Sequence, residues 1–306
     1  MLDKIKEKVK IKKIIAIVIA VLVVAELVTV VVVSESFFDT EKFAQSEKAD
    51  LVISQPLSSQ EHISWLEAKG EIINIIDTEL SAVKVKNNST SHSFMLIFHP
   101  LTEAPQDMAS YAHHFYELGF NVIIPDYIGE EFTMGFGEKD IVRKWISYIT
   151  EQDNKANIFV LGVGVGGTAA LLSTEGDVAE NVKGVISDSA YCDLSEVFSE
   201  NIKSVYGVSP FPAVQLSSIY TQMRKGWSFS QIDIKSVVKK SKVPILYIHG
   251  TEDSVVPVGQ SNELYEVTRA EGTEHFTIHG AQHAQALNTN SEKYWRQVDE
   301  FIRNCM

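Results

Sequence analysis

The sequence predicts an α/β protein with a mostly parallel sheet and helices on both of its faces. Short, continuous Val/Ile/Leu runs are typical of strands that are buried on both sides. Segments with helical periodicity separate these runs, so strands and helices alternate along the chain. The first two runs lie too close together for a crossover helix, which predicts an antiparallel hairpin at the start of the sheet. The composition, 45% hydrophobic and 22% charged, is that of a folded chain and excludes global disorder.

Each element follows from a local pattern. Apolar side chains recur at helical spacing over 108–118, 141–149 and 294–305, and each of these segments is predicted to be a helix. Residues 190–240 are rich in aromatics and weakly periodic, which predicts a helical cap inserted over the carboxyl edge of the sheet. The predicted strands are 71–77, 80–86, 94–99, 120–125, 157–162, 183–187, 243–249 and 274–279.

The N-terminus has the pattern of a membrane anchor. Residues 14–33 are almost entirely apolar, and as a helix they would span about 30 Å, the thickness of a bilayer core. Residues 1–13 carry six lysines and are predicted to stay in the cytoplasm, which places the body outside it on a single-pass cell-membrane protein. A cleavable signal peptide ending near Ala25 is the competing interpretation.

The rest of the chain divides into a stalk with a leading helix at 34–70 and one domain at 71–306. The net charge of the whole chain is −13, and the residues beyond 33 hold 21 Lys and Arg against 37 Asp and Glu, a charge of −16, which argues against nucleic acid as a partner. Cys192 and Cys305 are the two cysteines and are predicted to be free thiols, because two cysteines cannot build a disulfide framework.

Residues 162–167 read GVGVGG, follow a predicted strand and open a helix. Two kinds of site have this form. In a nucleophile elbow, G-x-S-x-G, the glycines permit a sharp turn that exposes the central side chain at a helix N-terminus. In a dinucleotide loop, G-x-G-x-x-G, glycines let a pyrophosphate approach the helix; here Gly162, Gly164 and Gly167 would form the loop, and Asp188 would bind the ribose.

The flanking motifs resemble those of the α/β-hydrolase family, in particular bacterial hydrolases with an N-terminal membrane segment. The resemblance covers roughly residues 62–304. It rests on the glycine segment and on the motifs FHPL at 98–101, DMASYA at 107–112, GFNV at 119–122, PD at 125–126, HGTEDSVVP at 249–257 and GAQH at 280–283. The resemblance implies an α/β-hydrolase fold and a nucleophile, acid and histidine in that chain order.

By this resemblance position 164 is the nucleophile, Asp253 the acid and His283 the base, while the N–H groups of Leu101 and Val165 stabilise an oxyanion. The nucleophile position, however, holds Gly164, which has no atom to form an acyl-enzyme. Pro100 also stands where the family has a glycine, and residues 126–131 replace an arginine- and glycine-rich loop. The sequence therefore predicts a degenerate serine hydrolase of the ester or amide class, retained to bind a small acyl or carboxylate ligand or a partner that the sequence does not identify.

Two other functions stay open. The first is an active hydrolase of acyl esters or peptides that uses activated water or a substitute nucleophile, the candidates being Thr168, Ser173, Ser189 and Cys192. The second is the dinucleotide-binding protein described above. No other cofactor is predicted, and no metal, because His275, His279 and His283 fall in a strand and loop rather than on one helix face. His113 and His114 are predicted on a solvated helix face, and His99 and His249 in strand-end hydrogen bonds.

Overall fold

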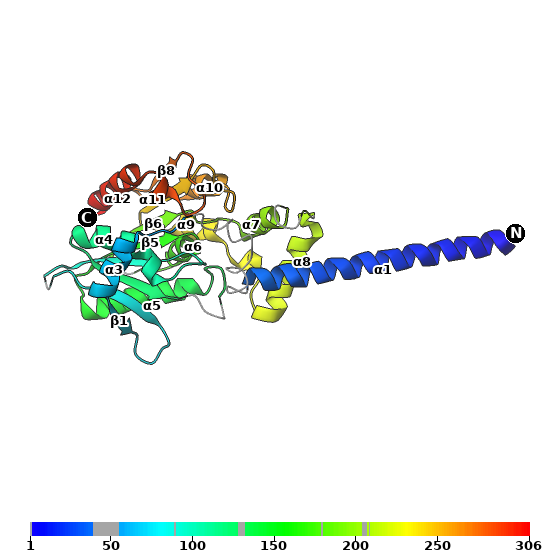
Figure 1. Ribbon diagram of the computed structural model, residues 1–306, viewed down its shortest axis with the longest axis horizontal. Helices are drawn as coiled ribbons and strands as arrows, with labels where there is room; N and C mark the ends of the chain where they lie inside the picture. The colour runs from blue at the N-terminus through cyan, green and yellow to red at the C-terminus, as the bar shows by residue number, and fades with distance from the viewer. Residues whose placement is uncertain are drawn as a thin grey trace.

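A computed structural model describes residues 2–38, 55–88, 90–127, 132–178, 180–203, 207 and 209–306. Its centre is an eight-stranded sheet in the order β1-β2-β4-β3-β5-β6-β7-β8. β1 pairs antiparallel with β2, and β2 pairs antiparallel with β4, whereas the other neighbours are parallel. The predicted α/β class and the antiparallel start are therefore confirmed (Figure 1).

All eight predicted strands form, most of them within one or two residues of the expected ends. Strands β3, β4, β5 and β7 are mostly apolar and almost completely buried, as expected for strands covered on both faces. The strands are β1 Glu71–Asn74, β2 Ser81–Val85, β3 Ser93–Phe98, β4 Asn121–Asp126, β5 Asn157–Val163, β6 Val182–Asp188, β7 Ile245–Gly250 and β8 Glu274–Ile278.

Helices cover both faces of the sheet, and each face has its own apolar core. On one face, aromatic side chains such as Tyr111, Phe115 and Phe301 pack beneath α3 (Gln60–Lys69), α4 (Ala109–Glu117) and α12 (Ser291–Cys305). A short 3-10 turn, η2 (Pro105–Met108), precedes α4, and α11 (Ala286–Thr289) precedes α12. The other face is covered by α5 (Glu138–Gln152), α6 (Val165–Leu172), α9 (Ile234–Lys240) and α10 (Gly259–Val267).

The parallel strands β3, β5, β6 and β7 end at the same edge of the sheet, where ligands bind in open α/β sheets. The loops after these strands carry the predicted site residues. They hold Leu101 after β3, Gly164 after β5, Asp188 at the end of β6 and Asp253 after β7. The topology therefore gathers residues that are up to 150 positions apart along the chain.

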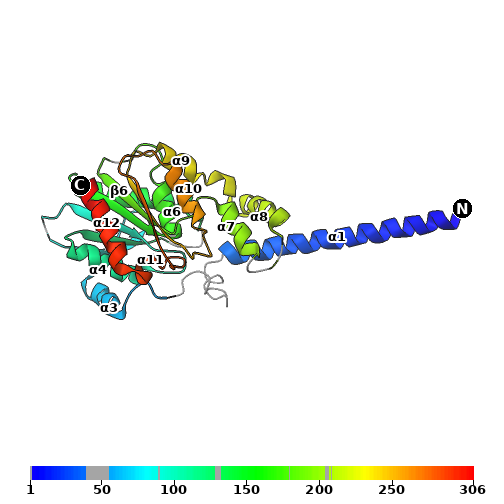
Figure 2. The same cartoon turned by 90° about the horizontal axis from the view of Figure 1, so that it is seen from above.

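The N-terminal helix is longer than the sequence predicts. α1 (Leu2–Phe38) runs through both the lysine-rich segment and residues 34–38, which the sequence analysis assigns to the stalk. Its segment Lys10–Val32 is long and apolar enough to cross a membrane, a property that an anchor and a signal sequence share. Most of α1 projects away from the body (Figures 1 and 2). The remainder of the predicted stalk, 39–54, lies outside the described residues.

The predicted cap contains α7 (Leu194–Asn201) and α8 (Pro210–Lys225), and α8 packs against the C-terminal end of α1. The segment 234–240 is not part of this cap. It forms α9, whose buried Ile234 and Val238 pack the helix back onto α6 and α10. The helical insertion is therefore shorter at its C-terminal end than the sequence predicts, and the short 3-10 turn η4 (Phe229–Gln231) leads out of it.

Candidate functional site

Gly164 forms the turn between β5 and α6. Its backbone has φ 57° and ψ −122°, a conformation that costs a residue with a side chain roughly 1–3 kcal/mol. The turn is fixed from both sides: the Gly164 N–H donates to the carbonyl of Asp188 at 2.8 Å, and its carbonyl accepts from the Thr168 N–H at 3.1 Å. This is the geometry of a nucleophile elbow, with the central residue at the N-terminus of a helix.

The neighbouring glycines are required by close backbone packing. A Cβ atom on Gly162 would lie 2.2 Å from the carbonyl oxygen of Gly166, and one on Gly166 would lie 2.5 Å from that of Phe98. A Cβ on Gly167 would lie 2.9 Å from the carbonyl oxygen of Gly162. These distances are shorter than van der Waals contact, so the three glycines let α6 approach β3 and β5.

Asp253 and His283 meet below the elbow. The Nδ1 atom of His283 lies 2.8 Å from Oδ2 of Asp253, and both residues are buried. The other carboxylate oxygen, Oδ1, accepts backbone N–H groups from Val255 and Val256 at 3.0 and 2.8 Å. Because the carboxylate binds the Nδ1–H group, the other ring nitrogen of His283, Nε2, is the one that faces Gly164.

A second histidine, His249, shares this carboxylate, and the sequence analysis assigns it no such role. Its Nε2 atom lies 3.2 Å from Oδ2 of Asp253 and 2.8 Å from the carbonyl oxygen of Val256, so the predicted strand-end hydrogen bond is present as well. The spacing was available as a signal, because His249 precedes Asp253 by four residues in the most specific motif of the chain. His249 therefore helps to fix the carboxylate.

The pKa values follow from this pairing. Burial alone would raise the pKa of Asp253, but the charge of His283 and the hydrogen bonds from His249 and His283 hold it well below its usual range. Burial would lower the pKa of His283, but the charge and the hydrogen bond of Asp253 raise it above its usual value of 6.5. His283 therefore retains a proton to higher pH than an isolated imidazole does.

Gly164 and His283 face each other. A Cβ atom placed on Gly164 would lie 3.4 Å from Nε2 of His283 and 3.3 Å from Cβ of Pro100. A side-chain oxygen at position 164 would thus be within reach of the imidazole and pressed against the proline. The structure brings together all three residues that the chain order places in one site.

The predicted oxyanion donors are chain neighbours of Pro100 and Gly164. Val165 is the first residue of α6, and Leu101 follows Pro100 in the loop after β3. Among the described residues, neither backbone N–H has a recorded acceptor. The loop is held by buried His99, whose Nδ1 contacts the Pro100 carbonyl at 2.9 Å, and by Tyr127, whose hydroxyl donates to the carbonyl of His99. Of the predicted substitute loop 126–131, residues 128–131 lie outside the described residues.

The geometry does not support the dinucleotide interpretation. Asp188, the proposed ribose ligand, is fully buried and accepts a hydrogen bond from Ser189 at 2.9 Å. Burial raises its pKa to about 6. Gly162 and Gly167 are packed against backbone rather than open to a phosphate.

The four candidate substitute nucleophiles are also buried. Ser173 donates to the carbonyl of Ala170, and burial raises the pKa of Cys192 to about 12, which disfavours the thiolate. Ser189 lies nearest the base: its hydroxyl donates to Asp188 and accepts the N–H of Ala284 at 3.2 Å, which couples β6 to the loop that carries His283. The hydroxyl of Ser189 is therefore part of a buried hydrogen-bond network.

Comparison with known proteins decides the family. Residues 108–306 match the prolyl oligopeptidase family. The chain belongs to that family. This match covers the glycine elbow, Asp253 and His283, and it confirms the resemblance to α/β-hydrolases. A Bacillus subtilis (strain 168) relative, the uncharacterized protein YqkD, is 25% identical over 217 residues, which are 69% of this chain and 71% of that protein.

Solved structures share the fold of this prolyl oligopeptidase family member. The esterase Pf2001 of Pyrococcus furiosus superposes with a TM-score of 0.63 at 20% identity, covering 81% of this chain and 96% of that one. The acylaminoacyl peptidase of Pyrococcus horikoshii superposes with a TM-score of 0.53 at 18% identity, covering 78% of this chain and 41% of that one. At these identities the likeness establishes the fold alone.

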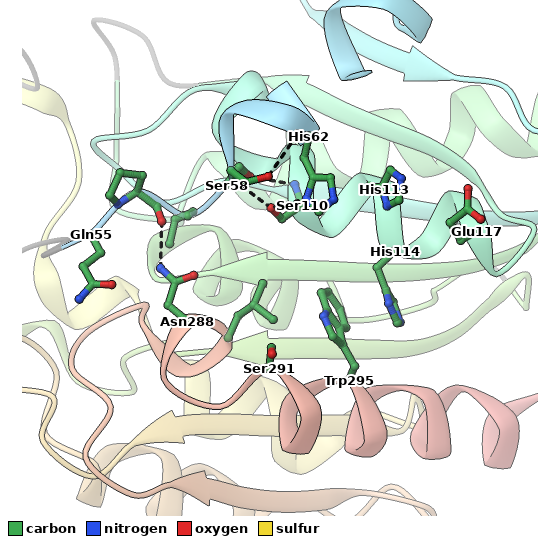
Figure 3. A pocket seen from close by; sticks show the side chains of 14 residues that line it. Gln55, Ser58, His62, Ser110, His113, His114, Glu117, Asn288, Ser291 and Trp295 are labelled. Carbon is green, nitrogen blue, oxygen red and sulfur yellow. Dashed lines mark hydrogen bonds between the residues drawn. The ribbon is translucent and has the colours of Figure 1, made fainter. Parts of the chain in front are cut away.

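A separate pocket of about 640 Å³ lies between α3, α4 and α12 of this family member, and none of Gly164, Asp253 and His283 lines it (Figure 3). The prediction that His113 and His114 lie on a solvated face is wrong. The ring of His113 stacks on His62 at 4.4 Å, and that of His114 stacks on Trp295 at 3.8 Å.

Two polar contacts at this pocket also tie the helices together. His114 contacts Asp299 on α12 at 2.8 Å, and Nδ1 of His62 on α3 lies 2.9 Å from the hydroxyl of Ser110 on α4. Burial lowers the pKa of His62, and the charge of the nearby His113 lowers it further. The His62 contact therefore docks the leading helix α3 on α4, and the His114 contact docks α12 on α4.

Proposed function

We propose that this protein is a membrane-anchored α/β-hydrolase of the prolyl oligopeptidase family that lacks the serine mechanism and binds a small carboxylate or acyl ligand. The observation that carries the proposal is the position of the acid–base pair relative to the elbow. His283 and Asp253 have the geometry of a base and its carboxylate, and Nε2 of His283 faces a glycine. Glycine offers no oxygen or sulfur to attack an acyl carbon.

The same groups suit an anion. Leu101 follows Pro100 and Val165 follows Gly164, so their backbone N–H groups are the proposed donors at the point that Nε2 of His283 faces. The raised pKa of His283 favours its cationic form, and α6 directs its positive N-terminal end at the same place. A carboxylate oxygen at this point would meet both N–H donors and the imidazolium.

The anchor supports a location at the cell membrane. The segment Lys10–Val32 is apolar enough to span a bilayer, and the six lysines of residues 1–13 favour a cytoplasmic N-terminus with the body on the outer side. Protease added outside intact cells that lack an outer membrane should then digest the body and spare the N-terminal stub. Complete protection of the body would reverse this orientation, and an N-terminus that begins after Ala25 would replace the anchor by a signal peptide.

Ligand binding is tested with hexanoate as the probe on the full chain in detergent. Calorimetry should detect binding near pH 6, and binding should weaken as the pH rises through the pKa of His283. His283→Ala should abolish binding of hexanoate. His279→Ala, which alters a histidine outside the proposed site, should not. Binding that is unchanged in His283→Ala would refute the carboxylate site.

Catalysis is tested separately with p-nitrophenyl butyrate and a fluorophosphonate probe. We expect no probe labelling and no turnover above the His283→Ala control. Turnover that depends on His283 without labelling would instead establish a hydrolase that uses activated water, and labelling at Ser189 or another residue would establish a substitute nucleophile.

A further inference from the structure

The cap helix α8 has an exposed apolar side. Phe211, Ile219 and Met223 are 72%, 56% and 80% exposed, although each is a large apolar side chain. Ile219 and Met223 are four residues apart and so lie on one face of the helix. The opposite face, with Ser217 and Thr221, is almost completely buried. The buried face also holds Ala213 and Val214, and the exposed face also holds Gln215 and Gln222. Ile219 and Met223 are therefore two large apolar side chains exposed together on a face that is otherwise polar.

This helix lies where the apolar span of α1 ends. Val30 and Ser34 of α1 are 3% and 0% exposed, and α8 is the helix that packs there. Just beyond them, Glu35 accepts a hydrogen bond from Tyr220 and lies 3.9 Å from the guanidinium of Arg224. α8 is thus fixed to α1 at the level of residues 30–35, directly after the span Lys10–Val32.

The direction of the helix matters as much as its level. α8 crosses α1 rather than running along it, while the rest of α1 projects away from the body (Figures 1 and 2). With α1 across a bilayer, α8 would lie along the membrane surface. On its body side, the N–H of Phe229 reaches the hydroxyl of Ser218 at 3.2 Å. Around the helix, Ile219 is about 100° and Met223 about 140° from Ser218, so both lie on a different side of α8 from that contact.

The charges fit the same arrangement. The last turn of α8 carries Arg224 and Lys225, both exposed. Basic side chains beside an apolar face are typical of helices that lie in the headgroup region, where their cationic ends reach lipid phosphates. In this arrangement lipid, rather than another protein, would cover Ile219 and Met223.

We propose that α8 docks on the surface of the bilayer, with Ile219 and Met223 inserted at the boundary between headgroups and acyl chains and with the basic last turn of the helix close to the anionic phospholipid headgroups. The inference rests on the proposed membrane anchor but not on ligand binding at His283. The contact of α8 would hold the body against the membrane with the cap toward the lipid. The protein would then be held by this surface contact in addition to the membrane span of α1.

The test uses the full chain in vesicles of phosphatidylcholine and phosphatidylglycerol, with Cys192→Ala and Cys305→Ala to remove native thiols. A fluorophore is attached to a single cysteine at position 219, 223, 76 or 20. Ile76 is 86% exposed on the β1–β2 hairpin and serves as the control for an exposed apolar site of the body, and Ala20 reports on the anchor. Quenching by lipids with a spin label near the headgroup measures contact with the interface.

We expect quenching at positions 219 and 223 to exceed that at position 76 by about threefold or more, as insertion of the side chains requires. Equal quenching at 219, 223 and 76, with position 20 in lipid, would overturn the docking and leave the anchor intact. A fluorophore at position 20 that stays in water would overturn both.

A second measurement asks whether the apolar side chains cause the contact. The fluorophore is moved to exposed Gln215, and Ile219→Glu and Met223→Glu are introduced together. Quenching at position 215 should fall by about threefold or more, whereas Ile76→Glu should leave it unchanged. Quenching that survives both glutamates would contradict the proposed insertion.

Discussion

The two halves of the candidate site differ in what holds them together. On the acid–base side, polar side chains carry the geometry: one carboxylate receives His283, His249 and two backbone N–H groups. On the elbow side no side chain takes part, and the geometry comes from backbone packed against backbone at Gly162 and Gly166. The first half is an acid–base pair of side chains, and the second has the shape of an elbow with glycine at its centre.

This contrast indicates which constraints act on each half. Backbone packing at the elbow is part of the contact between α6 and the sheet, so folding alone maintains it. The Asp253 cluster also contributes to folding, because a buried charge must remain paired. Both halves can therefore persist for structural reasons, and their presence alone does not establish catalysis. Experiments that separate the two contributions follow, from the largest expected effect to the smallest.

The largest effect is expected at the elbow from Gly166→Ala. The added Cβ would lie 2.5 Å from the carbonyl oxygen of Phe98, so α6 must move away from β3. We expect the free energy of unfolding to fall by about 4 kcal/mol or more. Denaturant unfolding in detergent measures this, and Gly259→Ala is the matched control, since nothing lies within 4 Å of its added Cβ. Equal stability of the two variants would show that the elbow is not held by close packing.

The next effect tests the other half with Asp253→Ala. The substitution leaves His283 and two backbone N–H groups without their acceptor in a buried place, while His249 keeps only the carbonyl of Val256. We expect a loss of about 3 kcal/mol in the free energy of unfolding. The comparison with Asp193→Ala, which removes an N-cap carboxylate on α7 and should cost about 1 kcal/mol, shows how much is specific to the buried cluster. A cost no larger than that of Asp193→Ala would mean that the cluster contributes little to folding.

A smaller effect is the pH dependence of the His283 pair. Because the pKa of His283 is raised in the folded state, the pair contributes its full stability below the unfolded pKa of about 6.5 and loses it as the pH rises through the folded pKa. The difference in melting temperature between the wild type and His283→Ala should therefore shrink as the pH rises above about 6.5. Asp188, with a pKa of about 6, titrates in both proteins, so its contribution largely cancels. A difference that grows with pH would contradict the raised pKa.

The sequence predicted those parts of the molecule that depend on local patterns. The buried strands were found because their apolar runs have clear ends, and the proximity of Gly164, Asp253 and His283 followed from the chain order of the resembling family. The roles of these residues remain predictions. The sharing of Asp253 by His249 was missed because it depends on how the chain turns after β7.

Other misses have the same physical origin. His113 and His114 look solvated on their own helix, and only α3 and α12, which pack on α4 from distant parts of the chain, supply His62 and Trp295 as partners. The continuation of α1 through residues 34–38 was missed because three polar residues, 34–36, follow the apolar run, yet Ser34 is buried and α8 packs against α1. Tertiary contacts decided both cases.

The smallest effect is expected from Gly164→Ser, which supplies the one hydroxyl that the elbow lacks. The base is well placed for it, since the new Cβ would lie 3.4 Å from Nε2 of His283. If the serine were the only loss, esterase activity should return with this substitution alone.

We nevertheless expect kcat/KM toward p-nitrophenyl butyrate to stay below about 10² M⁻¹s⁻¹, a hundredth of the ~10⁴ M⁻¹s⁻¹ at the lower end for working enzymes. The new side chain would press against Pro100 at 3.3 Å, and Pro100 carries the loop of the Leu101 donor. One oxyanion donor is worth roughly 10²–10³ in rate, so a small displacement of that loop removes most of the gain. Unfolding should also become easier by about 1 kcal/mol, because serine is strained at φ 57°. Activity in the working range, abolished again by His283→Ala, would show that both halves of the site are competent and that Gly164 is a single isolated loss.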